Sequence, residues 1–272
     1  MLYIKKQPTP SKIHHAAQRM KTSERWLSIE EGDTKAVRDC FEHLEYYDDQ
    51  EKRYIYAKSL IRAELLKEQH HLCAYCMTPI EDDGQKTKVE HFVPLSSSND
   101  KALDYQNFLA VCKGGEKPHW QIQDTKVGER ILCCEAVKGD HTELTIDPRD
   151  QDMMNHIAYY SNGEIYFEGL SDYPEDVCAK IRSDLDETLR LNGKINPDGS
   201  RQDTATRLLY NRKATYQATN DVLRRLRKEG KLTLSEIERR IQTIINAEYM
   251  DAFAGVKLFI LYREWNRLSK HP

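Results

Sequence analysis

Apolar residues at helical spacing lead up to a closely spaced pair of cysteines. Between residues 54 and 71 the recurring apolar positions are Tyr56, Leu60, Ile61, Leu65 and Leu66. Their spacing predicts an amphipathic helix over 54–71 that ends close to Cys73. Upstream, IKKQPTPSKI predicts an extended opening, because a residue before proline avoids helical dihedrals, and residues 23–47 predict helix in parts.

Downstream of the cysteines, shorter runs predict strands at residues 86–92 and 157–167. The second run, IAYYSNGEIYF, places Asn-Gly between aromatic residues, which is typical of a β-hairpin. Residues 177–191 are amphipathic, NPDGS predicts a turn, and 204–226 and 234–268 predict long helices. Thr233 and Glu236 have the spacing of a capping box. One apolar face is predicted to follow it, made of Ile237, Ile241, Ile244, Ile245 and Tyr249.

These elements predict an α+β fold that is mainly helical and has three parts. Residues 1–50 form an extended and helical segment, 51–169 carry the chemistry, and 170–272 form a helical C-terminal region. The chain has 272 residues, of which 39% are hydrophobic and 31% charged, as in a hydrophilic globular protein. No apolar run approaches the ~20 residues of a membrane span, and no secretory h-region opens the sequence. We therefore expect a cytoplasmic protein with no membrane association.

The net charge of -3 conceals an uneven distribution of charged residues. From residue 201 to 270 fifteen Lys or Arg stand against eight Asp or Glu, a balance of +7, whereas residues 30–50 are acidic. Such asymmetry can mark a nucleic-acid face. Solvated charges on long helices would produce the same pattern, so both interpretations stay open.

The cysteine spacing predicts a metal site. Cys73-Ala-Tyr-Cys76 allows two thiolates to reach one tetrahedral zinc ion, although a CxxC pair also suits redox chemistry. Two further ligands would come from Cys112 and from either Cys133 or Cys134, of which we favour Cys134 because of the residues that follow it, described in the next paragraph. The other two of the seven cysteines, Cys40 and Cys178, are predicted to be ordinary thiols.

Between and after these cysteines the sequence resembles the HNH, or ββα-metal, nuclease family. The resemblance consists of the CxxC pair, Glu90-His91-Phe-Val-Pro94, an Asn107 ahead of an apolar stretch and Cys112, and Cys134-Glu135-Ala-Val-Lys138-Gly139. Two features depart from the family pattern. A long insertion, KGGEKPHWQIQDTKVGERILC, follows Cys112, and Glu90 stands where Asp or His is more usual.

The resemblance implies a role for each matching residue. His91 would be the general base, and Glu90 and Glu135 would bind a catalytic Mg²⁺ or Mn²⁺. His141 is a runner-up for the second ligand, although solvent exposure is the simpler explanation for it and for His119. Asn107 would fix the loop that orients His91.

The substrate class is less constrained by the sequence. DNA is the first expectation, and an RNA such as tRNA stays open because water attack on a phosphodiester does not require a particular sugar. The lysines near the motif would either contact flanking phosphates or be solvated; they are Lys86, Lys88, Lys113, Lys117 and Lys138.

The flanking sequence resembles a subset of this family. The IKKQPTP opening, the KGD-to-IDPRD link, the aromatic hairpin and the DETLRLNG helix are similar to the HNH nuclease subunit of Septu-type anti-phage systems, some of them retron-linked. This implies an ABC- or SMC-like ATPase partner, and in a retron context a reverse transcriptase with its RNA–DNA hybrid. A dense apolar set would be core or would partly dock the ATPase: Phe253, Val256, Leu258, Phe259, Leu261, Tyr262 and Trp265.

Two rival functions compete with the nuclease. The first is a non-catalytic, zinc-stapled module that binds nucleic acid or protein, for which the Glu90-His91 pair would have no use. The second is a thioredoxin-like redox protein, which the context of Cys73 disfavours because the cysteine follows a helix and not the strand of a βαβ unit.

Overall fold

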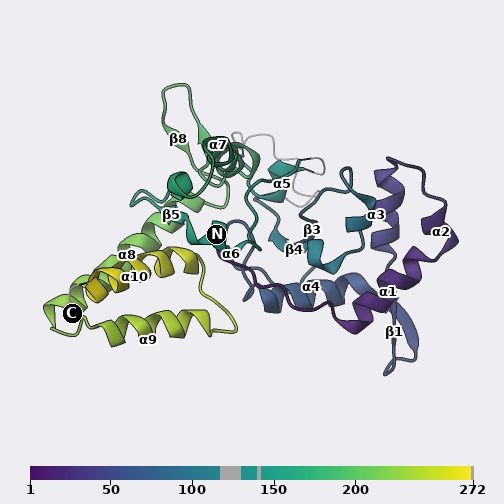
Figure 1. The fold of residues 1–272 in the computed structure, drawn as a ribbon, viewed down its shortest axis with the longest axis horizontal. Helices are drawn as coiled ribbons and strands as arrows, with labels where there is room; N and C mark the ends of the chain where they lie inside the picture. The colour runs from purple at the N-terminus through teal and green to yellow at the C-terminus, as the bar shows by residue number, and fades with distance from the viewer. Residues whose placement is uncertain (117–129, 140–141, 271–272) are drawn as a thin grey trace.

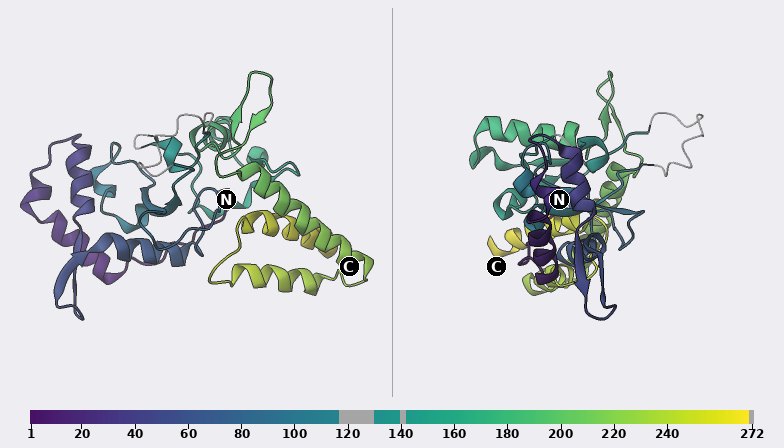
Figure 2. Two further views of the ribbon diagram at one scale, coloured as in Figure 1. Left: turned by 180° about the vertical axis from the view of Figure 1, so that it is seen from behind. Right: turned by 90° about the vertical axis from the view of Figure 1, so that its right-hand side faces the viewer.

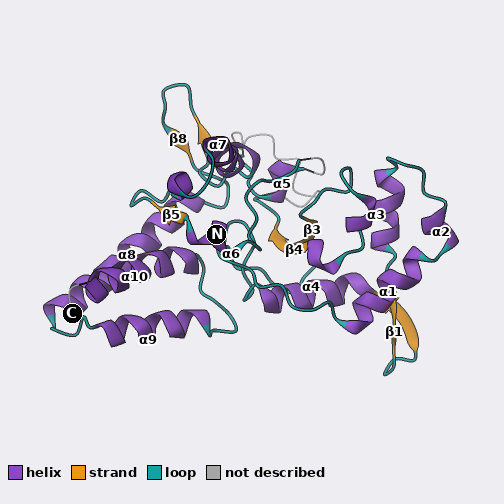
Figure 3. Cartoon of the chain, viewed as in Figure 1, coloured by secondary structure: helices purple, strands orange, loops and turns teal. Residues whose placement is uncertain are grey.

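The structure is a computed structural model that describes residues 1–116, 130–139 and 142–270 (Figure 1). Helices dominate this part of the chain, and its strands form small two-stranded antiparallel sheets (Figure 3). The predicted α+β, mainly helical class is confirmed for these residues. No helix among them is both long enough and apolar enough to cross a membrane.

Three helices and a hairpin follow an opening without helix or strand that continues to Pro10, so the predicted extended segment was wrong only for residues 11–13, which begin a helix. The helices are α1 (Ser11–Lys21), α2 (Glu24–Leu27) and α3 (Thr34–Glu42), and the hairpin joins β1 (Glu45–Asp48) to β2 (Arg53–Tyr56). The predicted helix over 54–71 was wrong at its start, since α4 spans Ala57–Glu68. Tyr54 and Tyr56 are exposed on β2 instead, because Tyr54-Ile55-Tyr56 alternates in burial and pairs with β1.

The centre of the molecule contains the hairpin that carries Glu90, His91 and Cys112. Strand β3 (Thr87–His91) pairs with β4 (Phe108–Cys112), and the short 3₁₀ turns Asn99–Lys101 and Tyr105–Asn107 lie between them. All five residues of β4 are buried, and the short helix α5 (Glu135–Lys138) follows in sequence. The predicted strand at 86–92 is confirmed.

A second hairpin connects the centre to the C-terminal helices. After α6 (Gln151–Asn155), β5 (Ile157–Tyr159) pairs with β6 (Ile165–Phe167) around the predicted Asn-Gly turn. Gly163 has a φ of +95°, and a Cβ there would lie 2.2 Å from the Leu209 carbonyl oxygen, so the turn needs glycine. Helix α7 (Glu175–Ser183) continues into a π turn (Asp184–Thr188), and β7 (Lys194–Ile195) and β8 (Arg201–Gln202) enclose NPDGS.

The C-terminal helices α8 (Leu208–Lys228), α9 (Leu234–Ile245) and α10 (Ala254–Lys270) lie together at the end of the molecule opposite α1–α3 (Figures 1 and 2). The prediction of one helix over 234–268 was wrong, because residues 246–253 interrupt it. In this link the amides of Met250 and Phe253 donate to the carbonyl oxygens of His70 and Met77. The backbone is therefore bonded to the CxxC loop, and Phe253 has a φ of 58° that ends helical continuity.

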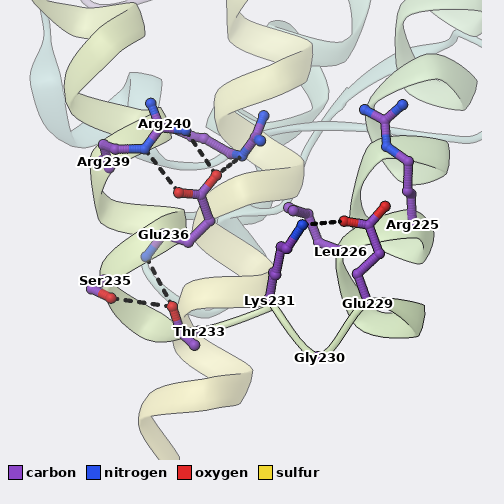
Figure 4. Close-up of a pocket in the computed structure, with 10 residues that line it drawn as sticks. All are labelled: Arg225, Leu226, Glu229, Gly230, Lys231, Thr233, Ser235, Glu236, Arg239 and Arg240. Carbon is purple, nitrogen blue, oxygen red and sulfur yellow. Dashed lines mark hydrogen bonds and ion pairs between the residues drawn. The ribbon is translucent and has the colours of Figure 1, made fainter.

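Only one of the two hydrogen bonds of the predicted capping box forms at the start of α9. The Thr233 hydroxyl accepts from the Glu236 amide at 3.2 Å, but the Glu236 carboxylate accepts from Arg239 and Arg240 instead of reaching back (Figure 4). The Thr233 amide donates to the Lys231 carbonyl oxygen. Of the predicted apolar face, Ile237 and Ile241 are buried, and Ile244 and Ile245 are partly buried. The prediction was wrong for Tyr249, which lies beyond the end of α9 and is 64% exposed.

The larger of two buried apolar clusters among the described residues contains residues from Met1 to Leu261, and the smaller consists of Val37, Leu95 and Ala102. Phe253 and Ala254 of the C-terminal region belong to the same cluster as Cys73 and Met77. The division into residues 1–50, 51–169 and 170–272 stays a prediction.

Candidate metal centre and adjoining cavity

Four cysteine sulfurs from three parts of the chain come together beside the central hairpin. Cys73 and Cys76 follow α4, Cys112 ends β4, and Cys134 precedes α5. All four are buried and free, and their sulfurs lie within 4.8 Å of one another. A zinc tetrahedron with 2.3 Å bonds has edges of about 3.8 Å. The Cys76–Cys112 and Cys112–Cys134 sulfur distances of 3.6 and 3.8 Å fit it, so the cluster could bind a metal such as zinc.

Cys133 lies outside this set. Its sulfur contacts the Gly114 carbonyl oxygen at 3.7 Å and the Thr206 hydroxyl at 3.5 Å. Its sulfur also lies 3.8 Å from the Cys134 sulfur, but it is not one of the four sulfurs that lie within 4.8 Å of one another. The sequence left the choice between the two open, and the structure places the favoured Cys134 in the cluster. Cys40 and Cys178 are buried elsewhere.

Two backbone amides donate hydrogen bonds to sulfurs of the cluster. The Cys112 amide donates to the Cys73 sulfur at 3.3 Å, and the Gly114 amide donates to the Cys112 sulfur at 3.4 Å. The bond with Cys112, followed by those with Cys134 and Cys73, holds the pKa of the Cys76 thiol well below its usual value. The bond with Cys133 raises the pKa of Cys112 well above its usual value, and the bond with Cys112 does the same for Cys134. Among these three thiols Cys76 is therefore the one favoured as thiolate, which is the form that binds metal.

A cavity of about 300 Å³ lies on β3 and α5, next to the cysteine cluster, and Glu90, His91 and Glu135 all line it. The charged residues around it are Arg38, Glu42, Lys58, Arg62, Lys88, Glu90, Lys113, Glu135 and Lys138. The structure therefore brings the three sequence-predicted residues to one cavity. Their roles stay predictions.

Glu90 is paired with a buried lysine. The Lys138 Nζ lies 2.6 Å from Glu90 Oε1, and the two side chains are only 1% and 9% exposed. Lys138 also donates to the His91 carbonyl oxygen at 3.4 Å, and the Tyr75 hydroxyl donates to Glu90 Oε1 at 3.5 Å. Burial raises the pKa of Tyr75 well above its usual value, so its hydroxyl stays a donor.

Glu135 is paired in the same way with Lys88, whose Nζ lies 2.6 Å from Glu135 Oε2 and 3.0 Å from Glu116. Burial alone would lower the pKa of Lys88, but the bonds to these two carboxylates outweigh it and raise the pKa. Sequence reasoning missed both pairs. It considered Lys88 and Lys138 only as phosphate contacts or solvated residues, and Lys138 is buried.

The His91 ring is held in one orientation. Its Nε2 lies 3.0 Å from the Ala102 carbonyl oxygen, and the ring lies edge-on to Phe41 and Phe108 at 4.7 and 5.0 Å between centroids. A carbonyl oxygen only accepts, so Nε2 carries the proton and Nδ1 has the lone pair in the neutral ring.

Asn107 is 2% exposed and links the two ends of the loop between β3 and β4. Its Oδ1 accepts from the Val93 amide at 2.8 Å, and its Nδ2 donates to the carbonyl oxygens of Val93 and Lys101 at 3.0 and 3.1 Å. Lys101 precedes Ala102, so these bonds hold the backbone that orients His91.

The remaining predicted residues either lie away from the cavity or are not among the residues that the structure describes. Lys86 pairs with Glu81 on the surface. His119, Lys117 and His141 lie outside the described residues. Among the residues that are described, the four cysteines are the one group of three or more potential ligands with all donor atoms within 4.8 Å.

Comparison with known proteins gives one distant relative to report. No protein-family model matches the chain. Over 110 residues the chain is 24% identical to the Septu protein PtuB of Bacillus thuringiensis. The chain is distantly similar to a Septu protein. The match covers 39% of this chain and 35% of the Bacillus protein, so the chain spans about a third of that relative's length.

Proposed function

We propose that this chain is a metal-dependent HNH endonuclease, acting on DNA in the first instance, and an effector of an anti-phage defence complex. The observation that carries the proposal is the single cavity lined by Glu90, His91 and Glu135 beside a four-cysteine cluster. A β-hairpin followed by a short helix is also the order of elements expected of a ββα-metal site. The similarity to a Septu protein supports the defence context.

Each of the cavity residues has a different role in the proposed hydrolysis. His91 Nδ1 accepts the proton of the attacking water, and Asn107 holds the loop whose Ala102 carbonyl oxygen fixes the ring. Glu90 and Glu135 would hold the Mg²⁺ or Mn²⁺, which supplies electrostatic stabilisation of the phosphate and the leaving oxygen. Two carboxylates suit such an ion, because Mg²⁺ keeps several waters and binds substrate phosphates.

The cysteine cluster, with zinc, would hold the hairpin and α5 together. Its ligands come from the loop after α4, the end of β4 and the start of α5. Zinc would therefore connect the strand that leads to Cys112 with the helix that carries Glu135.

His91→Ala tests the catalytic proposal, and His15→Ala, which removes an exposed histidine of α1, is the matched control. Purified protein, with and without the ATPase encoded beside it and ATP, is incubated with plasmid DNA, linear duplex and tRNA in Mn²⁺ or Mg²⁺. We expect wild type and His15→Ala to cut, and His91→Ala to lose at least 100-fold in rate with zinc content unchanged. No cutting by wild type under any condition, or equal cutting by His91→Ala, would favour the non-catalytic binding module.

We further propose that the ATPase docks on the C-terminal helices. Of the apolar set on α10 and before it, Phe253, Val256, Leu258 and Leu261 are buried in the core, whereas Tyr262 is 46% exposed. Tyr262→Ser in the full chain should weaken co-purification with the ATPase, and Tyr47→Ser on the distant β1 should not. Equal recovery with both variants would remove Tyr262 from the interface.

A further inference from the structure

Two ion pairs cross between β3 and α5. Lys88 and Glu90 are two residues apart on the strand and share a face, while Glu135 and Lys138 are three apart on the helix and share a side. The strand lysine pairs with the helix glutamate, and the helix lysine pairs with the strand glutamate, each at 2.6 Å. Both proposed carboxylate ligands are therefore already held by a lysine from the opposite element.

The crossed pairs fix the position of a helix that is too short to hold itself. Helix α5 has four residues, and helices of that length are not stable alone. Side-chain exposure is 1% for Lys138 and 28% for Lys88, so the first pair lies inside the protein and the second at the cavity wall. Lys88 is therefore the member of the two pairs that can be changed with the smaller structural cost.

The same lysines leave the cavity without net negative charge. Among the described residues that line it, six Lys or Arg stand against three Glu. Asp82 and Glu116 pair with Arg62 and Lys88 from outside the lining, and counting them still leaves a balance of +1. A free divalent cation gains little on such a wall, whereas a phosphate is attracted to it and brings both negative charge and oxygen ligands.

We propose that Lys88 and Lys138 are positioning residues that make loading of the catalytic ion depend on bound nucleic acid. The inference rests on the proposed function, because it takes Glu90 and Glu135 as the ligands of that ion. The cavity then holds the ion tightly only when a phosphodiester of the substrate is present. The catalytic ion is therefore loaded only on a chain that has already bound nucleic acid.

Mn²⁺ binding to the full-length, zinc-loaded chain tests this, with free Mn²⁺ measured by its electron paramagnetic resonance signal. All variants carry His91→Ala, so that a short duplex oligonucleotide is bound without being cut. We expect the duplex to tighten Mn²⁺ binding at least tenfold. Lys88→Met should tighten Mn²⁺ binding without duplex by about tenfold and reduce the duplex effect.

Two controls separate the crossed pair from general charge effects. Lys88→Arg keeps the pair and should behave as the parent. Lys86→Met breaks an exposed pair with Glu81 of nearly the same length, 2.7 Å, outside the cavity, and should leave Mn²⁺ binding unchanged.

Each outcome bears on one of the two proposals. Equal Mn²⁺ affinity with and without duplex, or no change in Lys88→Met, would overturn the inference even if the wild-type chain cuts DNA. Coupled Mn²⁺ and duplex binding in the His91→Ala background, together with a wild-type chain that cuts no nucleic acid, would support the inference and reject the nuclease.

Discussion

Replacing Lys138, the buried partner of Glu90, should destabilise the protein strongly. Lys138→Met removes the ammonium but keeps a chain of similar length, so Glu90 stays buried, at 9% side-chain exposure, without its 2.6 Å partner. Removing one member of a buried ion pair costs about 3–5 kcal/mol, because the remaining charge has lost its compensation. At about 2–4 °C per kcal/mol for a chain of this size, the melting temperature should fall by roughly 10 °C.

The double variant Lys138→Met with Glu90→Leu tests whether the charge left on Glu90 causes the loss of stability. It removes both charges, and replacing a buried pair by apolar residues is often neutral or stabilising. We expect it to recover most of the lost stability, whereas a defect in packing around Lys138 would persist. The single variant Glu90→Leu completes the cycle and gives the coupling energy of the pair.

Melting followed by circular dichroism and urea titration at neutral pH measures all four proteins. Zinc content is checked in each, so that loss of the cysteine site is not mistaken for loss of the pair. A fall of less than 2 °C in Lys138→Met, or a double variant no more stable than the single one, would refute the assignment of Lys138 as the counter-ion of Glu90.

Three further predictions concern other parts of the molecule. Cys134→Ser should lose zinc and most of its folded population, and Cys133→Ser should keep one zinc per chain by native mass spectrometry; the reverse order would contradict the geometry. Asn107→Ala deletes three hydrogen bonds at a buried site and should cost about 3 kcal/mol in urea unfolding, with a cost under 1 kcal/mol counting against its role. Arg239, followed by Arg240, lowers the pKa of Glu236 from 4.5 to about 2, so its stabilising contribution is present above 4.5 and disappears as the pH falls toward 2. Glu236→Gln should make the free energy of unfolding depend less on pH between 4.5 and 2. An unchanged pH dependence would exclude the contribution of Glu236.

Features decided by neighbours in the sequence could be predicted from it. The Asn-Gly pair at 162–163 predicted the second hairpin, because a tight turn depends on the conformations open to two adjacent residues. The CxxC spacing predicted that Cys73 and Cys76 share a site for a similar reason, whereas Cys134 was favoured from the resemblance to the HNH family. Thr233 was correctly predicted to cap α9.

Features decided by distant contacts could not be predicted. The sequence predicted one helix over 234–268, but contacts with His70 and Met77, far away in sequence, hold residues 246–253 outside a helix. The crossed pairs were hidden for a related reason. Lys88 and Lys138 are separated in sequence by the long insertion, and nothing local identifies a lysine as the partner of a carboxylate 47 or 48 residues away.

The link at 246–253 connects the C-terminal helices to the proposed zinc loop by several independent contacts. The Ala247 carbonyl oxygen lies 2.7 Å from His70 Nδ1, the Phe253 amide donates to the Met77 carbonyl oxygen, and the Gly255 amide contacts the Met77 sulfur at 3.3 Å. A Cβ at Gly255 would lie 2.7 Å from that sulfur, so α10 begins in direct contact with the residue that follows Cys76. A partner that moves α9 or α10 would therefore move the backbone of the CxxC loop. Through a metal shared with Cys112 and Cys134 it would also act on β4, which pairs with the strand of Glu90, and on α5, which carries Glu135. Removing the helices after residue 169 would open this shared core, so the contribution of the C-terminal region to partner binding has to be measured with point variants in the full chain.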